Sequence, residues 1–373
     1  MDGEGRGAEP SGGAFVLERV RGAGFRNLAA FELTPGPALN VVSGPNGAGK
    51  SNVLEAIGLL CAGRSFRGAR LEALLQEGAE QGWLQADALV RPVREQRRIE
   101  MARPRHRRLL HEGKRPRSVA WWRAHWPVVW FHPGSLQVSA GPPQQRRDML
   151  DGLLELLDPS GTADRQAYER ALRSRNRLLK EGPQGEEAMG AYEQVLARHG
   201  PRLVAARRAM LRAVGPLAER AFAEISGATL ALSLRYVPTA PEAPDEFLRA
   251  LRASREHDVR LKRTTLGPHL DEVAVRLGGA ATRQRASQGQ HRAVALALVL
   301  AQAELLAARL GRRPLLLLDD VSSELDPARN ARFFEAAVRR GGQLFVTTTD
   351  ARFVPAAGPR CDWRIEDGRL RAA

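Results

Sequence analysis

The spacing of hydrophobic and polar positions changes along the chain. Residues 15–17, 31–33 and 39–42 are short apolar runs bounded by glycine or proline, a pattern that predicts strands. Over residues 53–60 the apolar positions recur at helical spacing instead. Residues 90–130 alternate again and predict an antiparallel sheet that ends in an apolar strand. The first part of the chain is therefore expected to combine strands with one early helix.

The middle of the chain is predicted to be helical. Leucines at helical spacing in residues 144–157, and further periodic segments at 163–180 and 186–225, predict three helices. The third is expected to be interrupted at Gly200 and Pro201. Charged residues at helical spacing are expected to form a solvated face. The arginines of this face are Arg170, Arg173, Arg177, Arg207, Arg208 and Arg212.

Strand and helix signals alternate after this insert. Residues 229–237 and 272–277 predict strands on either side of a helix at residues 245–256. A long apolar helix is expected over residues 293–310, and another helix is expected to open at Pro327, since proline suits a first helical position. The alternation predicts an α/β fold.

Four segments are expected from these patterns. Residues 1–14 predict a disordered tail. Residues 15–143 and 227–373 are expected to form the two parts of one α/β lobe, the first of which carries a basic antiparallel sheet. Residues 144–226 are expected to form an α-helical insert lobe.

The charge of the chain favours a polyanionic partner. Its 373 residues include 57 Lys or Arg and 42 Asp or Glu, a formal charge of +15. Between Arg91 and Arg117 there are eleven Arg or Lys and three Glu, about half of the whole excess. We therefore expect DNA to bind chiefly there, with contributions from Arg103, Arg105 and Arg107.

The cysteines and the longest apolar run bear on location. Cys61 and Cys361 lie far apart, which favours a reducing, cytoplasmic compartment and offers no cysteine framework for zinc. The uninterrupted apolar run at residues 293–301 is too short to cross a bilayer, so we expect no membrane partner.

One glycine-rich segment has the spacing of a phosphate-binding loop. It follows the apolar run at residues 39–42 and precedes the helical pattern at residues 53–60. Its glycines allow backbone N–H groups to converge on phosphate, Lys50 can reach the β- and γ-phosphates, and Ser51 can ligand Mg²⁺. The pattern predicts a nucleoside triphosphate site made of Gly44, Pro45, Asn46, Gly47, Ala48, Gly49, Lys50, Ser51 and Asn52.

Two carboxylates close a buried strand late in the chain. Residues 315–318 are four leucines, followed by Asp319 and Asp320, the pattern of a strand in a parallel sheet whose acidic end lies at the ligand edge. Asp319 is expected to hold Mg²⁺, and Asp320 is expected to polarise the attacking water. Asp320 and Lys50 are the two predicted catalytic residues.

A serine-glycine turn stands before the long apolar helix. Ser287, Gln288, Gly289 and Gln290 place a hydroxyl and helix N-terminal amides together, which predicts a second anion site. Its position, about 30 residues before the strand that ends at Asp319 and far after Lys50, is similar to that of the signature loop of ABC-type ATPases. In those proteins this loop meets the γ-phosphate held by a partner subunit, so the resemblance implies an ATP-dependent homodimer.

The chain resembles the RecF family of bacterial recombination-repair ATPases from about residue 15 onward. The resemblance is carried by Arg26-Asn27, Gly44 to Asn52 with Leu54-Glu55-Ala56 following, Gly63-Arg64-Ser65 with Arg67, Gly267-Pro268-His269, Ala286 to Gln290 with Arg292, residues 316–326 and residues 343–349. It implies an ABC-type ATPase head with a mixed sheet, an antiparallel sheet subdomain and a helical insert.

The same resemblance implies an activity and partners. The family binds ATP and Mg²⁺, binds DNA at gaps and junctions, hydrolyses ATP slowly with stimulation by DNA, and cooperates with RecO and RecR to load RecA. It also implies that Arg26 contacts the nucleotide and that the family supports replication and the SOS response.

Three other functions compete with this interpretation. A P-loop kinase would explain Lys50 and Asp319 but not Ser287 or the basic strands. An ABC subunit of another complex, such as a transporter, would have a shorter interval between Lys50 and Ser287 and a histidine where residues 347–349 are threonines. A binding module with a purely structural nucleotide would not need both Asp319 and Asp320.

Overall fold

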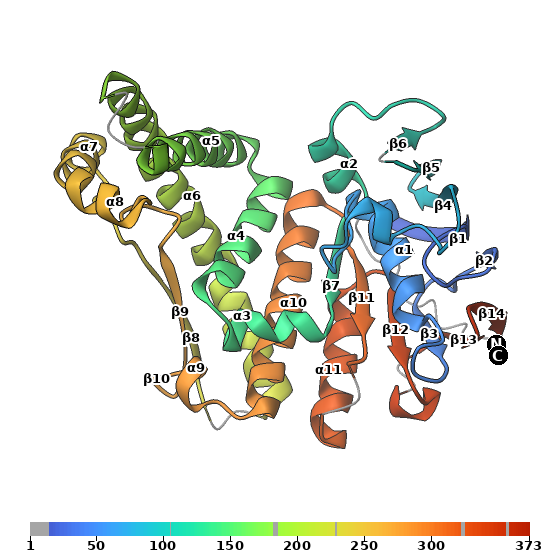
Figure 1. Cartoon of the computed structure of the whole chain (residues 1–373). Coiled ribbons are helices and arrows are strands. Elements are labelled where there is room, and N and C mark those ends of the chain that lie inside the picture. Colours follow the sequence, from blue (N-terminus) through green and yellow to red (C-terminus); the bar gives the residue numbers. More distant parts are fainter. Residues whose placement is uncertain (1–14, 105, 182–185, 228–229, 322–324, 356–357) are drawn as a thin grey trace. The chain divides into compact units, whose positions relative to one another are not determined.

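The computed structural model describes residues 15–104, 106–181, 186–227, 230–321, 325–355 and 358–373. Contacts divide it into two compact units, one that ends at Gly134 and resumes over Gln302–Ala373, and one that comprises Ser135–Ala301 (Figure 1). The predicted tail at residues 1–14 lies outside the described residues, and the predicted segment boundaries stay a prediction.

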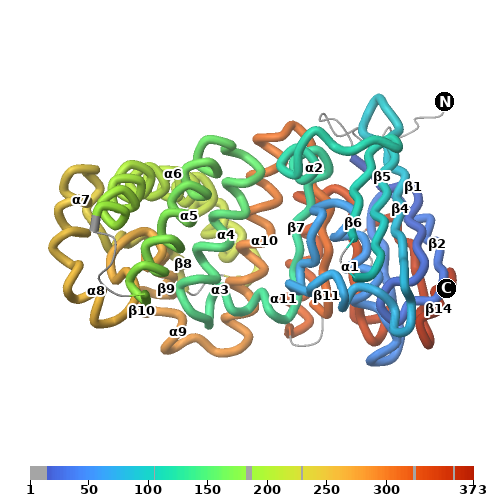
Figure 2. Tube along the Cα trace, turned by 45° about the horizontal axis from the view of Figure 1, so that its top comes forward, coloured from blue at the N-terminus to red at the C-terminus, as the bar shows by residue number. Residues whose placement is uncertain are grey.

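The first unit contains a five-stranded antiparallel sheet. The burial pattern alternates along its strands, as expected when one face packs on a core. This sheet confirms the strands predicted at residues 15–17 and 31–33. It also confirms the antiparallel pairing predicted for the basic strands (Figure 2). In spatial order its strands are β2 (Phe31–Leu33), β1 (Phe15–Ala23), β4 (Gln81–Val90), β5 (Val93–Ala102) and β6 (His106–His111).

The second sheet of the first unit is mixed. Every pair in it is parallel except the terminal hairpin, and its central strands are fully buried, which the apolar runs predicted. In spatial order its strands are β14 (Arg369–Ala372), β13 (Arg360–Glu366), β3 (Leu39–Ser43), β12 (Leu344–Thr348), β11 (Leu315–Asp319) and β7 (Val128–Phe131).

One predicted strand belongs to a different sheet from the one expected. β7 was expected to continue the basic antiparallel sheet, but it pairs in parallel with β11. The helix α2 (Val119–His125) separates it from β6 in sequence. Three of the four β7 residues are buried, which suits a strand covered on both faces rather than the half-exposed basic sheet.

The helix α1 (Lys50–Ala62) is the core helix of the first unit. It contacts β4 and β5 of one sheet and β7, β11 and β12 of the other, so it is enclosed by both. Every residue from Val53 to Ala62 is buried. The unit also contains α11 (Pro327–Arg340), where Pro327 is the first residue as predicted and the Asp326 side chain accepts from the Arg329 N–H at 3.0 Å.

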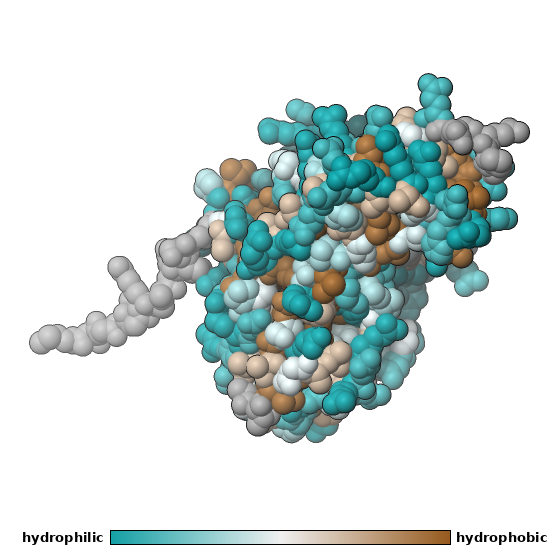
Figure 3. All heavy atoms as spheres, turned by 90° about the vertical axis from the view of Figure 1, so that its left-hand side faces the viewer, coloured by the Kyte–Doolittle hydropathy of each residue, from teal (hydrophilic) through white to brown (hydrophobic). Residues whose placement is uncertain are grey.

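The second unit is mainly helical. It confirms the predicted helices of the insert and the two strands that follow them. The face shown in Figure 3 is largely hydrophilic, with scattered hydrophobic residues. The elements of the second unit are α3 (Gln137–Ala140), α4 (Pro143–Leu157), α5 (Pro159–Glu181), α6 (Glu186–Ser226), β8 (Leu232–Val237), α7 (Pro244–Ala253), α8 (Arg255–Leu261), β9 (Glu272–Leu277), β10 (Ala280–Ala281) and α9 (Thr282–Arg285).

The interruption predicted at Gly200 and Pro201 is wrong. α6 continues through Pro201 and through Pro216 without a break. A Cβ at Gly200 would lie 2.7 Å from Cε1 of the fully buried Phe247. Close packing on α7 thus holds this stretch helical where local preference alone would interrupt it.

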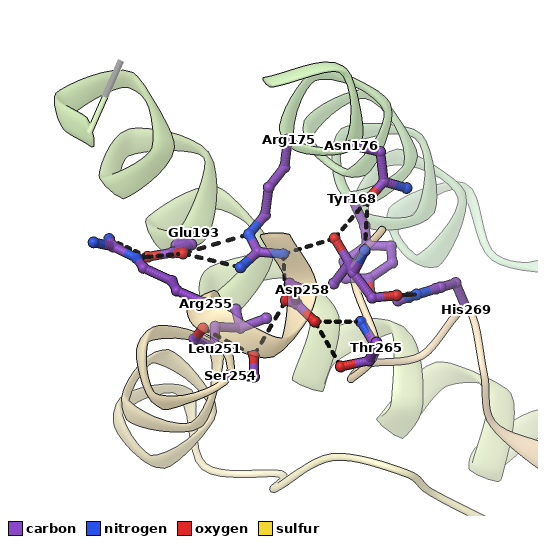
Figure 4. A network of polar contacts seen from close by, with 11 residues as sticks. Tyr168, Arg175, Asn176, Glu193, Leu251, Ser254, Arg255, Asp258, Thr265 and His269 are labelled. Atoms are coloured by element: carbon purple, nitrogen blue, oxygen red, sulfur yellow. Dashed lines mark hydrogen bonds and ion pairs between the residues drawn. The ribbon is translucent and has the colours of Figure 1, made fainter. Parts of the chain in front are cut away.

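Buried arginines of the helical insert include Arg175 and Arg207, and Arg207 was expected on the solvated face. Arg207 is 4% exposed and forms an ion pair with Asp151 at 2.8 Å. Arg175 is fully buried and donates to Asp258 at 2.7 Å and to Glu193 at 3.2 Å (Figure 4). Each is matched by a buried carboxylate, as a buried charge requires.

α10 (Gln288–Leu310) begins five residues before the predicted start. It continues from the second unit into the first. By length and composition this helix could cross a membrane, whereas the sequence analysis judged its uninterrupted apolar run too short to do so. Its residues from Ala293 to Ala301 are all buried, as in the core helix of a globular fold, so it is weak evidence for a span.

Candidate nucleotide site

The predicted phosphate-binding loop connects β3 to α1. Gly44 has a φ of 157°, and a Cβ there would lie 2.2 Å from the carbonyl oxygen of Ile365. Gly49, the residue before α1, has a φ of 111°. An L side chain would clash at the first position and be strained at both, so the loop conformation depends on these two glycines.

Backbone amides are available where the loop enters α1. The N–H groups of Gly49, Lys50 and Ser51 have no hydrogen-bond acceptor among the described residues. No side chain caps the helix. Uncapped amides at the positive end of a helix are a phosphate-binding arrangement.

The neighbouring asparagines fix the loop from one side. Asn27 donates from Nδ2 to the carbonyl oxygen of Gly47 at 3.0 Å. Its Oδ1 accepts from Nδ2 of Asn52 at 2.7 Å. The sequence analysis included Asn27 and Asn52 in the resembling segments without assigning this contact, which joins the loop after β1 to the first turn of α1.

Lys50 lies across the loop. Its Nζ donates to the carbonyl oxygens of Gly44 at 2.8 Å and Pro45 at 2.9 Å. Burial lowers the pKa of Lys50, and the charges of Asp320 and Asp319 oppose this shift. The three predicted polar groups therefore share one electrostatic environment.

Asp319 and Asp320 stand at the carboxyl end of β11. Asp319 is 4% exposed and its Oδ1 accepts from Oγ1 of Thr347 on β12 at 2.6 Å. Thr347 Oγ1 in turn accepts from the N–H of Asp320 at 3.1 Å. Asp320 has a φ of 52°, a left-handed conformation that is uncommon for a residue other than glycine and is a form of strain found at functional sites.

A fully buried glutamate, Glu55, organises the cations beside the loop. Arg26 donates to both of its oxygens from Nε and Nη2 at 2.9 Å, and Ser65 donates to Oε1 at 2.5 Å. Arg67 lies 3.6 Å from Glu55 and 3.7 Å from Asp319. The sequence analysis included Glu55 in the resembling segments without assigning it a role, although an acidic residue within an apolar helix is a signal for a paired buried charge. The predicted contact of Arg26 with a nucleotide stays a prediction.

His132 is a group beside the site that the sequence analysis missed. It follows β7, the strand beside β11, and its Nδ1 accepts from the N–H of Gly134 at 3.1 Å. Its ring packs on Phe66 with centroids 5.5 Å apart. Burial lowers the pKa of His132, and the charge of Asp319 opposes the shift. The imidazole is therefore within the electrostatic range of the carboxylate.

The predicted signature segment belongs to the second unit. Ser287 accepts at Oγ from the N–H of Gln290 at 3.3 Å, and Gln290 Oε1 accepts from the N–H of Ser287 at 2.8 Å. These reciprocal bonds form a capping box at the start of α10, with Gln288 and Gly289 in its first turn. A role of these residues toward a nucleotide stays a prediction.

The segment Gly267-Pro268-His269 is fixed within the same unit (Figure 4). His269 Nε2 donates to the carbonyl oxygen of Thr264 at 3.1 Å, so its Nδ1 accepts from the Tyr168 hydroxyl at 2.8 Å. A Cβ at Gly267 would lie 2.3 Å from that hydroxyl oxygen. The glycine thus permits the close approach of Tyr168.

The donor set of the first unit fits a magnesium nucleotide. The amides of Gly49 to Ser51 and the ammonium of Lys50 suit phosphate oxygens. The Ser51 hydroxyl and the Asp319 carboxylate are oxygen ligands of the kind Mg²⁺ takes together with phosphate and water. The chemistry that such an ion supplies is neutralisation of charge on the phosphates.

Comparisons with known proteins identify the fold first. A family model described as an AAA domain matches residues 19–110. The solved Smc head domain of Pyrococcus furiosus has a TM-score of 0.58 at 16% identity, covering 96% of each chain. A glycine loop opens a buried helix, and two acidic residues lie at the end of another strand of the same sheet. The fold is that of the ABC-type ATPase head class.

Closer relatives identify the family. The DNA replication and repair protein RecF of Anaeromyxobacter sp. (strain Fw109-5) is 39% identical over 357 residues, 93% of this chain and 96% of the relative. The chain belongs to the RecF family of DNA replication and repair proteins. The solved recombination mediator protein RecF with ATP in the RecFOR pathway has a TM-score of 0.88 at 28% identity, covering 98% of this chain and 100% of that one. These findings confirm the resemblance and the predicted fold class.

Proposed function

We propose that this protein is an ATP-dependent DNA-binding protein of recombinational repair. It binds DNA at gaps and at junctions of single and double strands as an ATP-induced homodimer in the cytoplasm, and it hydrolyses ATP slowly with stimulation by DNA. With RecO and RecR it helps to load RecA, and it thereby supports replication and SOS induction. The observation that supports this proposal most is the nucleotide site of the first unit, together with membership of the RecF family.

The nucleotide chemistry is assigned to residues of that site. The loop from Gly44 to Asn52 binds the phosphates of ATP, and Lys50 leaves the loop carbonyls to contact the γ-phosphate. Asp319 and Ser51 hold Mg²⁺. Asp320 orients the attacking water, since positioning and charge neutralisation supply most of the rate in phosphoryl transfer.

The dimer follows from the signature segment. In ABC-type ATPases this segment of one subunit completes the nucleotide site of the other. The capping box from Ser287 to Gln290 presents the N-terminus of α10, whose first amides can face an anion. ATP bound to one chain then stabilises the dimer, because it binds the closed assembly better than the open monomer.

The DNA surface is assigned to the basic strands. Their exposed cations can follow a phosphate backbone and release counterions on binding. Arg105, one of the predicted contacts, lies outside the described residues. The exposed members of the segment are Arg91, Arg94, Arg103, Arg107, Arg108, Lys114, Arg115 and Arg117.

The rate of ATP hydrolysis with and without gapped DNA tests the proposal. We expect a low rate that rises when DNA is added and that is abolished by Lys50→Met, with Lys180→Met, at an exposed lysine in the last turn of α5, as the matched control for the loop lysine. Phosphoryl transfer to a small acceptor in place of water would favour a kinase. A rate that DNA leaves unchanged would favour an ATPase subunit of another complex.

A further inference from the structure

Three side chains with metal-binding atoms converge beneath α2 in the first unit. Glu95 lies on β5, His111 is the last residue of β6, and His125 is the last residue of α2. One ring nitrogen from each histidine and one carboxylate oxygen lie within 4.8 Å of one another. The residues come from three elements, so the cluster is a product of the fold and not of a local sequence motif.

Two members of the cluster are already in contact. His125 Nε2 lies 2.9 and 2.8 Å from the two oxygens of Glu95. Trp126 donates from Nε1 to Glu95 Oε2 at 3.0 Å and so fixes the orientation of the carboxylate. Hydrogen bonds from neighbouring residues orient the ligands of metal sites in the same way.

His111 supplies an independent observation. Its Nδ1 is buried and has no hydrogen-bond partner among the described residues. Buried polar atoms in native proteins are paired in the great majority of cases, and an exception calls for a bound water or ion. The neighbouring ring is the imidazole of His125, whose centroid lies 5.7 Å away.

The protonation states suit metal ligands. Burial lowers the pKa of His111 and of His125, which favours neutral imidazoles. Burial alone would raise the pKa of Glu95, but hydrogen bonds from His125 and Trp126 oppose this effect, and the pKa lies below its usual value. Because His125 Nε2 donates the proton of one of these hydrogen bonds, binding of a metal at that nitrogen would release the proton or shift it to Nδ1. Metal ions bind histidine and glutamate in these deprotonated forms.

We propose that Glu95, His111 and His125 form a binding site for a divalent transition metal ion, with Zn²⁺ as the preferred ion. Two imidazole nitrogens and one carboxylate oxygen are a ligand set that zinc takes in a tetrahedral arrangement, and water completes the fourth position. Mg²⁺ and Ca²⁺ prefer sites composed of oxygen atoms, so they are disfavoured here.

The distances require a modest rearrangement. With bonds of about 2.0–2.1 Å to zinc, tetrahedral ligand atoms stand about 3.3 Å apart. The contact between His125 and Glu95 would open by about half an ångström, and His111 would turn toward both. Trp121 stacks on His125 with centroids 4.4 Å apart and meets His111 edge to face at 4.9 Å, so it limits how far either ring moves.

The nearby cation Arg97 opposes metal binding but is shielded. Its guanidinium lies between the rings of Trp122 and Trp126, 4.1 and 4.3 Å from their centroids, and it donates to the carbonyl oxygen of Cys61 at 3.1 Å. The ring faces and the carbonyl stabilise this charge. An ion bound by the Glu95 carboxylate faces less repulsion than it would beside a bare cation.

A bound ion would connect α2 to the ends of two basic strands. The chain between His111 and the start of α2 carries Lys114, Arg115 and Arg117, all of them exposed. Binding at His111 and His125 would fix both ends of this connection and reduce its conformational freedom. The site would thus have a structural role, because it would restrain the exposed cations of this connection.

Zinc binding by the full-length protein tests the proposal. Protein freed of metal with a chelator is titrated with Zn²⁺ against a chromophoric competitor, and Co²⁺ is added separately to detect tetrahedral coordination by its visible absorption. We expect one ion per chain in the parent and in the control variant His106→Ala, whose exposed histidine begins β6. Glu95→Gln, His111→Ala and His125→Ala should each weaken binding at least tenfold.

Two results would overturn the site. One is a parent chain that binds no zinc at equimolar concentration. The other is binding of unchanged affinity in all three variants, which would place the ion elsewhere. Because a variant could unfold, circular dichroism of each is compared, and the melting temperature of the parent alone is measured with Zn²⁺ and with Mg²⁺. A rise with Zn²⁺ only supports the site, and equal melting temperatures contradict it.

Discussion

Glu55 carries a charge in a part of the first unit that is otherwise apolar. Its carboxylate has no exposed surface, and Arg26, Ser65 and Arg67 surround it. Arg67 also approaches Asp319, so this one carboxylate orders cations on both sides of the loop. Its role is therefore structural support of the nucleotide site.

The variant Glu55→Gln should destabilise the protein. The substitution keeps the shape but leaves Arg26 without its charged partner and Arg67 with Asp319 alone, so we expect the free energy of unfolding to fall by about 2–3 kcal/mol. Guanidinium unfolding curves measure this. The matched control is Glu32→Gln, whose ion pair with Arg19 is exposed and should contribute less than about 1 kcal/mol. Equal midpoints for both variants would refute the structural role of Glu55.

Asp320 separates binding of ATP from its hydrolysis. Asp320→Asn leaves Lys50 and Asp319 in place, so ATP should still bind, whereas hydrolysis should fall by about 100-fold or more as for loss of a general base. Steady-state ATPase assays with a fluorescent nucleotide titration test both parts. Asp350→Asn, at a partly exposed acid after β12 that pairs with Arg352, should hydrolyse ATP at the parent rate. Parent-like hydrolysis by Asp320→Asn would show that another group activates the water.

At the scale of elements, the basic strands divide their arginines between two faces. Arg98 and Arg108 flank Glu100 on one face, whereas Arg97 is buried against α2. Arg97, one of the eleven cations counted in this segment, is therefore not available to a DNA backbone. The aromatic residues that bury it, Trp122 and Trp126, follow it by about 25 residues, too far for the alternation of the strand to reveal the contact.

The salt dependence of DNA binding tests the exposed members of these strands. Charge reversal at Arg103 and Arg107 should reduce the slope of log affinity against log salt by roughly one unit for each lost phosphate contact. Fluorescence anisotropy with ATP present measures the slope. Arg364→Glu, an exposed arginine on β13, is the control. Identical slopes for all proteins would move the DNA surface elsewhere. Because the Arg107 variant loses a hydrogen bond to the carbonyl oxygen of Gly63, circular dichroism checks that it is still folded.

Replacement of glycine by alanine should have opposite effects on stability at two positions of α6. Gly215 has open space around its Cβ position, so Gly215→Ala should stabilise the helix by about 0.5–1 kcal/mol. Gly200→Ala would force a methyl group against Phe247 and should cost about 1–3 kcal/mol. Thermal unfolding compares the two. If both variants are stabilised, packing on Phe247 is not what keeps α6 continuous.

Local motifs predicted some elements and not others. The phosphate loop, α1 and β11 could be predicted because each is defined by consecutive residues. The pairing of β7 with β11 could not, because partner choice depends on contacts far apart in sequence. The hairpin of β13 and β14 was missed although it has a signal: Asp367 and Gly368, both at positive φ, stand between alternating apolar positions.

At the scale of the whole molecule, the predicted function requires two copies of the chain. Lys50 and Asp319 belong to one compact unit of the chain, and Ser287 belongs to the other. The sequence predicted these sets from spacing and from resemblance. A site shared between subunits is a property of an assembly, so neither the sequence nor the fold of one chain is sufficient to establish it.

The rate of ATP hydrolysis by a mixture of two inactive variants tests the shared site most directly. Lys50→Met damages the phosphate loop and Ser287→Arg damages the signature segment, so neither homodimer has an intact site. In a symmetric dimer, a mixed pair regains one intact site. We predict that an equimolar mixture recovers about a quarter of the parent rate, because half of the dimers are mixed and each has one working site of two. A mixture no more active than its separate components would contradict the proposed dimer.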